Sequence, residues 1–167
     1  MAMLDERVGK GMVLGGQTLT CLVPMRWSDM DAYGHINNVQ VLRLLEEARI
    51  HAFGAPGGTG AEGDQPPVAL FSSVNPGTQA LVVEHRVRFV DTLDYRNVPA
   101  RIDVWVSALK PASFTLSYLV LDPLTGVACV KAETILAFVD TNSGSVLRLS
   151  EEQKDALTPY RGASLFP

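Results

Sequence analysis

The sequence WSDMDAYGHINNVQVLRLLEEARI, residues 27–50, passes from a polar turn into an apolar run. Its two asparagines are favoured N-cap residues, and strong helix formers follow them, so we predict a helix over residues 38–52. The first backbone N–H groups of a helix have no partner within it and bind negative charge. The carboxylate of Asp31 and the imidazole of His35 precede this helix, and that combination suits attack on a carbonyl carbon. Asp29 would point to the opposite face of an extended stretch and is expected to be structural.

The rest of the chain predicts a sheet packed on this helix. Apolar side chains cover most of the helix circumference, which indicates heavy burial. Period-two patterns between turn residues predict strands at residues 18–26, 68–74, 80–90, 98–108, 113–121 and 127–139. Short connections favour antiparallel neighbours. We therefore expect one α+β domain over residues 17–149, an antiparallel sheet of about five to six strands wrapped around one long central helix.

Three segments fall outside this pattern. Residues 1–16 show no periodicity and are expected to form a flexible N-terminal arm. Residues 54–67 are dominated by Gly, Pro and Ala and predict a loop, which is either a lid or a disordered connection. In the C-terminal tail, residues 150–167, Ser150 and Gln153 have the spacing of a capping box and predict a short helix.

The composition excludes several classes of function. The chain has 167 residues, a normal length for one domain, and a net charge of −4. That charge disfavours nucleic acid and anionic membranes as partners, since both reward a broad basic surface. Cys21 and Cys129 are the only cysteines and neither has a nearby partner at metal-ligand spacing, so we expect no disulfide framework and no metal or other cofactor. Without an apolar signal segment or a membrane-length run, a cytoplasmic location is expected.

The chain resembles the hotdog-fold acyl-CoA thioesterases of the 4-hydroxybenzoyl-CoA thioesterase type. The matching motifs are Arg-Trp-Ser-Asp-Met-Asp at residues 26–31, Gly34-His35, Asn37-Asn38 and Leu-Leu-Glu-Glu-Ala-Arg at residues 44–49. The resemblance covers about residues 18–149. It implies the hotdog fold, hydrolysis of an acyl-CoA to the free acid and coenzyme A, and a homodimer or homotetramer with each site at a subunit interface.

The resemblance also implies roles for the residues of the turn. Asp31 matches the acidic residue that attacks the thioester carbonyl or deprotonates water, and His35 would lie beside that carbonyl. A backbone N–H at Asn37 or Asn38 would hold the oxyanion. From spacing alone, Asp31 is also interpreted as a turn former that binds its own backbone. Glu46 is the alternative base, because some hotdog enzymes use a glutamate on the helix.

The substrate-binding candidates are Tyr33, Leu45, Arg88, Arg96, Lys110 and Ser113. Arginine suits the phosphates of coenzyme A because it binds phosphate oxygens bidentately, although solvated surface charge also explains Arg88 and Arg96. The turn from Lys110 to Ser113 is included because related enzymes use it near the nucleotide. Leu45 either lines an acyl tunnel or fills the core.

Two other functions fit part of the pattern. A hotdog hydratase or dehydratase also pairs Asp and His on an acyl thioester, but its Gly-Asp-x-Asn-Pro-x-His run is absent from this sequence. A non-catalytic acyl-thioester binding protein would bind the same ligand without cleaving it. Only a hydrolase releases free coenzyme A, so thiol release separates the three hypotheses.

Overall fold

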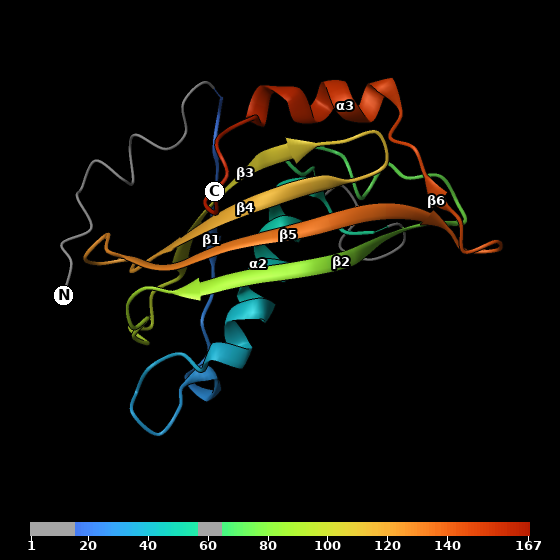
Figure 1. Ribbon diagram of the computed structural model, residues 1–167. Coiled ribbons are helices and arrows are strands. Elements are labelled where there is room, and N and C mark those ends of the chain that lie inside the picture. The colour runs from blue at the N-terminus through green and yellow to red at the C-terminus, as the bar shows by residue number, and fades with distance from the viewer. Residues whose placement is uncertain (1–15, 57–64) are drawn as a thin grey trace.

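An antiparallel sheet dominates the computed structural model, which describes residues 16–56 and 65–167 (Figure 1). Its strands are β1 (Leu19–Val23), β2 (Thr78–Phe89), β3 (Ala100–Leu109), β4 (Phe114–Leu121), β5 (Ala128–Asp140) and β6 (Val146–Leu147). The strand order is β1-β3-β4-β5-β2, and the short β6 pairs with β5. All pairings between strands are antiparallel, as predicted. The predicted arm, apart from Gly16, and most of the predicted 54–67 loop lie outside the described residues.

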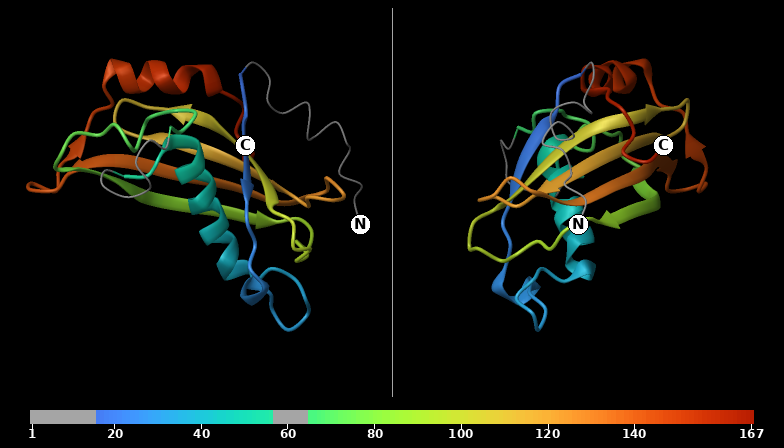
Figure 2. Two further views of the ribbon diagram at one scale, coloured as in Figure 1. Left: turned by 180° about the vertical axis from the view of Figure 1, so that it is seen from behind. Right: turned by 60° about the vertical axis from the view of Figure 1, so that its left-hand side comes forward.

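Helix α2 (Asn38–Phe53) lies across one face of the sheet, and its 16 residues agree with the predicted helix (Figure 2). It begins at the N-cap Asn37, whose side chain accepts a hydrogen bond from the Val39 N–H at 3.0 Å. Its sheet-facing residues, including Leu44 and Leu45, are completely buried. Apolar burial of this kind is the main source of stability for such a helix. No helix among the described residues is long and apolar enough to cross a membrane.

The predicted strand over residues 68–74 is wrong. This segment is irregular, although Val68, Leu70 and Phe71 are buried as an apolar run suggests. Its N–H groups donate to the last carbonyls of α2: Val68 to Ala52, and both Leu70 and Phe71 to Phe53. The segment therefore caps the C-terminal end of the helix. A run of apolar residues predicts that a segment is buried, but its hydrogen-bond partners decide whether it forms a strand.

The C-terminal tail covers the outer face of the sheet. After α3 (Glu151–Leu157), which begins with the predicted capping box, and the turn η2 (Thr158–Tyr160), the chain crosses towards β2. Leu165 and Phe166 pack on an apolar cluster of Trp105, Leu119 and Leu121. The tail is thus bound to the sheet along its length, which the sequence pattern did not predict.

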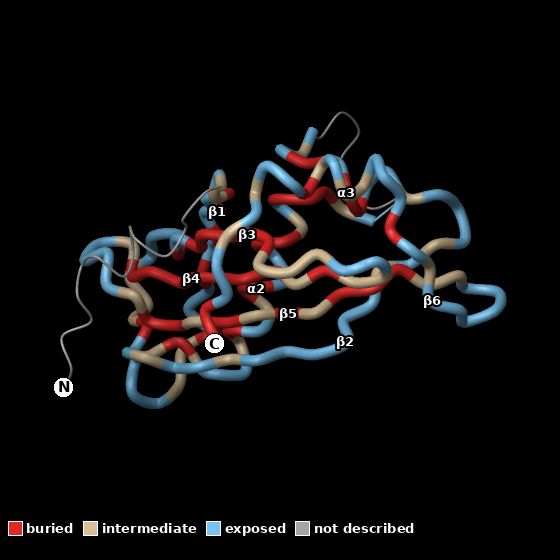
Figure 3. Tube along the Cα trace, turned by 45° about the horizontal axis from the view of Figure 1, so that its top comes forward, coloured by how far each residue is buried: buried red, intermediate tan, exposed pale blue. Residues whose placement is uncertain are grey.

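Strand β2 is a long, open edge of the sheet. It pairs with β5 on one side and with no described strand on the other. Most of its residues are exposed, as the pale colour of β2 in Figure 3 shows. Its exposed apolar side chains are Leu81, Val82, Val83 and Phe89. The N-terminal part of α2 extends past this edge, and Val39 there is 67% exposed (Figure 1).

Candidate active site

The turn after η1 (Trp27–Asp29) fixes the carboxylate of Asp31. The backbone N–H of Asp31 donates to the His35 carbonyl at 2.7 Å, and Gly34 closes the turn with a φ of 82°. The Oδ1 atom of Asp31 accepts hydrogen bonds from the backbone N–H groups of Tyr33, at 2.8 Å, and His35, at 3.2 Å. Its Oδ2 atom has no partner among the described residues. The turn-former interpretation and the catalytic one are therefore compatible, because one oxygen holds the turn and the other is free.

Asp29 joins this turn to helix α2. Its carboxylate is fully buried and binds the side chains of Arg26, at 3.0 Å, and Arg43, at 2.6 Å. Its carbonyl accepts the Asn37 N–H at 2.8 Å. Burial by itself raises the pKa of Asp29, but hydrogen bonds from Arg26 and the charge of Arg43 outweigh that effect and lower the pKa below its ordinary value. The expected structural role of Asp29 agrees with these contacts.

The first turn of α2 leaves one N–H group open. The Asn37 N–H is used by Asp29, and the Val39 N–H by the Asn37 side chain. The N–H groups of Gln40 and Val41 both donate to the Asn37 carbonyl. Only the Asn38 N–H lacks an acceptor among the described residues at this end of the helix. Of the two expected oxyanion donors, the geometry thus favours Asn38.

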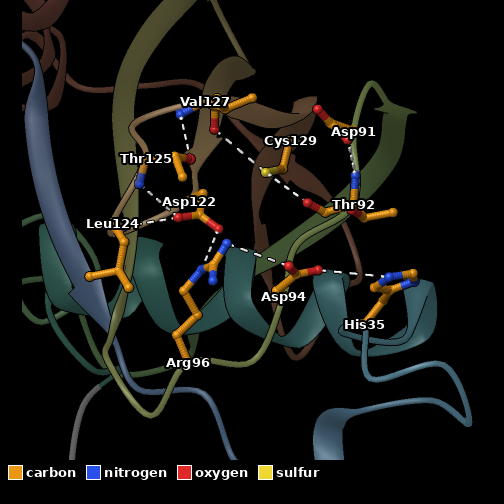
Figure 4. Close-up of polar contacts among 10 residues, drawn as sticks. All are labelled: His35, Asp91, Thr92, Asp94, Arg96, Asp122, Leu124, Thr125, Val127 and Cys129. Carbon is orange, nitrogen blue, oxygen red and sulfur yellow. Dashed lines mark hydrogen bonds and ion pairs between the residues drawn. The ribbon is translucent and has the colours of Figure 1, made fainter.

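A chain of ionic contacts runs from His35 into the sheet (Figure 4). His35 Nε2 lies 3.8 Å from Asp94 Oδ1, and Asp94 Oδ2 lies 3.4 Å from Arg96 Nη2. Arg96 Nε donates to Asp122 at 2.9 Å, and this hydrogen bond raises the pKa of Arg96. Asp122 in turn accepts the Leu124 N–H in the β4–β5 turn. Sequence reasoning missed Asp94, because its proximity to His35 depends on a contact between distant segments.

The substrate-binding candidates are scattered in the single chain. Tyr33 is 83% exposed at the tip of the turn, whereas Leu45 is fully buried in the core. Arg96 is already paired with two carboxylates. The guanidinium of Arg88 packs against the Phe166 ring on the outer face, 5.3 Å from its centroid. The alternative base, Glu46, is exposed on α2 and binds Arg49 at 3.4 Å.

Lys110 and Ser113 lie at the far end of the sheet from Asp31. The turn that carries Asp31 follows β1, whose last residue pairs with Ala100 at the start of β3. Lys110 follows the other end of β3, where its N–H donates to the Ser113 carbonyl at 2.9 Å. Within one chain, these two residues are not brought together with Asp31.

The two cysteines are unsuited to act as nucleophiles. Burial raises the pKa of both Cys21 and Cys129 to about 11. Each thiol lies against a backbone carbonyl, that of Ala48 for Cys21 and that of Thr92 for Cys129. Because the thiolate is the reactive form, neither group is activated.

The turn thus carries a carboxylate with one unbonded oxygen and leads into a helix whose Asn38 N–H has no acceptor among the described residues, and groups of these two kinds can serve as a base or nucleophile and as an oxyanion donor. The family comparison agrees, because the model of the thioesterase-like superfamily matches residues 25–157. The chain therefore belongs to this superfamily, whose hotdog fold is the antiparallel sheet with α2 across one face. It is a thioester hydrolase.

Individual relatives are distant. YsmA, an uncharacterized protein of Bacillus subtilis, is 28% identical over 140 residues, which cover 83% of this chain and 84% of YsmA. A predicted thioesterase from Bacillus stearothermophilus has a similar structure, with a TM-score of 0.70, 18% identity and coverage of 88% and 98% of the two chains. A Thermus thermophilus thioesterase solved with coenzyme A and zinc gives a TM-score of 0.62, 20% identity and coverage of 83% and 90%. These structural likenesses show a shared fold.

The contacts of Asp29 predict a pH-dependent contribution to stability. Because its pKa is lowered in the folded state, Asp29 stabilises the fold above its unfolded pKa of about 4, and this contribution is lost as the pH falls through the folded pKa. We expect Asp29→Asn to reduce the free energy of unfolding by about 2–4 kcal/mol near pH 7. Urea unfolding of both proteins from pH 7 to pH 3 measures this difference, which should shrink in acid. A difference independent of pH would contradict the assignment.

Proposed function

We propose that this protein is an acyl-CoA thioesterase that uses Asp31 as its nucleophile or general base. The observation that carries the proposal is the Oδ2 atom of Asp31, which accepts no hydrogen bond among the described residues and belongs to the turn that leads into helix α2, where the Asn38 N–H also lacks an acceptor in the described structure. A thioester carbonyl placed between them would meet a carboxylate at its carbon and a hydrogen-bond donor at its oxygen. Charge that develops on that oxygen would be stabilised by the Asn38 N–H.

Two routes use the same groups. In the first, Asp31 Oδ2 forms a bond to the acyl carbon, the carbon–sulfur bond breaks with its electron pair leaving on sulfur, and water then hydrolyses the mixed anhydride. In the second, Asp31 takes a proton from water while the water oxygen attacks the acyl carbon, and the carbon–sulfur bond then breaks with its electron pair leaving on sulfur. Neither route assigns a step to a metal or cofactor, since a thiolate is already a good leaving group. His35, in the same turn, is the neighbouring group for proton exchange.

The proposed assembly joins two sheets through β2. A pairing of two β2 strands about a two-fold axis would complete the open hydrogen-bond edge and cover its apolar side chains. Antiparallel pairing places the Thr78 end of one strand beside the Phe89 end of its partner. The Lys110 turn lies near the Thr78 end of β2. This follows because β2 and β4 both pair with β5, and Val82 of β2 and Phe114 of β4 both lie opposite Leu136. The Asp31 turn contacts the loop after Phe89, so each site would receive the Lys110 turn of the partner subunit.

This arrangement supports coenzyme A as the leaving group. The nucleotide phosphates need cationic partners, and Lys110 carries a charge with no ion pair among the described residues. The Thermus thermophilus relative of the same fold was solved with coenzyme A, which supports the same ligand here. Ser113, whose carbonyl closes the turn, would hold Lys110 in position, and the exposed ring of Tyr33 would contact the substrate at the mouth of the site.

The Asp31 assignment predicts a large loss of turnover without loss of fold. In Asp31→Asn, the side-chain oxygen can still accept the Tyr33 and His35 N–H groups, so the turn should persist. We expect kcat for thiol release from acyl-CoA to fall by roughly 100-fold or more, the scale for a lost general base. A panel of short, long and aromatic acyl-CoAs with a thiol reagent measures this. Wild-type rates in Asp31→Asn, together with a loss in Glu46→Gln, would move the role to Glu46.

The Lys110 assignment predicts an effect on binding alone. A phosphate contact far from the carbonyl binds ground state and transition state equally, so Lys110→Ala should raise KM for acyl-CoA by about threefold to tenfold and leave kcat unchanged. The matching acyl-pantetheine lacks the nucleotide and should be hydrolysed equally by the variant and the wild-type protein. Equal damage to both substrates would rule out the phosphate role.

The assembly predicts that charge on the β2 edge abolishes activity. Val83 is 63% exposed at the irregularity in the β2–β5 register. Val83→Lys would place two like charges near the proposed axis, so light scattering should show monomers and thiol release should fall in parallel. Leu22→Lys, on the opposite edge strand β1, is the matched control and should remain assembled and active. A fully active Val83→Lys monomer would refute the shared site.

A further inference from the structure

The contact between His35 and Asp94 has a consequence for the reaction. We propose that Asp94 is a positioning residue that accepts the Nε2–H of His35 during catalysis and leaves Nδ1 unprotonated for the reacting water. This inference rests on the proposed thioesterase function. In the anhydride route, Nδ1 would take a proton from water as the water oxygen bonds to the acyl carbon and the bond from that carbon to Asp31 Oδ2 breaks, and would then return the proton to the coenzyme A thiolate. The products are the free acid and the free thiol, and the ring ends neutral.

Backbone pairing holds the two residues opposite each other. His35 and Asp94 form an antiparallel bridge, and the next N–H, that of Ile36, donates to the Leu93 carbonyl at 2.7 Å. Their side chains therefore start from fixed neighbouring positions. The separation of 3.8 Å between His35 Nε2 and Asp94 Oδ1 is an ion-pair distance and exceeds that of a hydrogen bond. Catalytic hydrogen bonds are often long without substrate and tighten in the reacting complex.

The Asp94 oxygen that faces His35 has no hydrogen-bond partner among the described residues. Its Oδ1 atom is buried and accepts no hydrogen bond among the described residues. A buried acceptor without a donor is unfavourable, and the Nε2–H of His35 is the donor in reach. Both side chains remain about 40% exposed overall, so the His35 ring can rotate to close the gap. The unsatisfied oxygen therefore supports a contact completed during the reaction.

The other carboxylate oxygen of Asp94, Oδ2, is held by Arg96. Arg96 lies between Asp94, at 3.4 Å, and Asp122, at 2.9 Å, and so fixes one carboxylate against the other (Figure 4). Asp122 is itself held by the Leu124 and Thr125 N–H groups, both at 2.9 Å. Although burial opposes it, these hydrogen bonds and Arg96 lower the pKa of Asp122, so Asp122 stays charged and keeps Arg96 in place. In this arrangement, Arg96 orients Asp94 and is not free to bind phosphate.

A double-mutant cycle tests the coupling. We expect Asp94→Asn to lower kcat for thiol release by about tenfold with little change in KM, since an amide cannot impose the same tautomer on a histidine. In the His35→Gln background, the same substitution should have no further effect, because its target is gone. Asp91→Asn is the matched control, since among the described residues the Asp91 side chain binds the neighbouring Thr92 N–H alone. Independent, additive losses from His35→Gln and Asp94→Asn would overturn the proposal.

Nitrogen-15 NMR of the histidine side chains supplies a readout that needs no activity. The chain has three histidines, and the signal lost in His35→Gln assigns His35. At a pH where the ring is neutral, wild-type protein should carry the proton on Nε2, and Asp94→Asn should shift the ring towards a mixture of tautomers. A proton on Nδ1 in the wild-type protein, or no change in Asp94→Asn, would overturn the positioning role. If thiol release is absent, this measurement still decides the His35–Asp94 contact separately from the proposed function.

Discussion

The candidate site depends on the contacts made by the buried residue Asp29. It binds Arg26 ahead of the turn and Arg43 on α2, while its carbonyl accepts the Asn37 N–H. One residue thereby ties together the segment after β1, the turn and the start of the helix. A buried charge that loses its partners is strongly unfavourable, so this arrangement has few alternatives. The position of Asp31 relative to the helix follows from it.

The contacts of Asp29 also determine which backbone N–H groups at the start of α2 remain without an acceptor. Helix N-termini have several N–H groups without intrahelical partners, and here Asp29 and the Asn37 side chain use two of them. The Asn38 N–H is left as the donor that faces no acceptor in the described structure. Helix capping and the proposed oxyanion binding thus use neighbouring N–H groups. Asp29, which stabilises the start of the helix, also determines which N–H group remains for a ligand.

Much of the local structure was predictable from the sequence. The N-cap at Asn37, the helix after it and the capping box at Ser150 depend on neighbouring residues, and all are present. The segment from Val68 to Val74 was misassigned because its N–H groups bond to the end of a distant helix. Asp94 was missed for the same reason, since its contact with His35 joins segments 59 residues apart. Lys110 was grouped with Asp31 through family resemblance, and only the strand register shows that they lie at opposite ends of the sheet.

The proposed mechanism requires the thioester carbonyl to bind between Asp31 and the Asn38 N–H. A crystal structure with an acyl-CoA analogue in which a methylene group replaces the thioester sulfur tests it most directly. We expect the carbonyl oxygen within about 2.7–3.1 Å of the Asn38 nitrogen, with Asp31 Oδ2 facing the carbonyl carbon directly or through one water. A carbonyl bound beside Glu46, with both Asp31 and the Asn38 N–H out of reach, would contradict it.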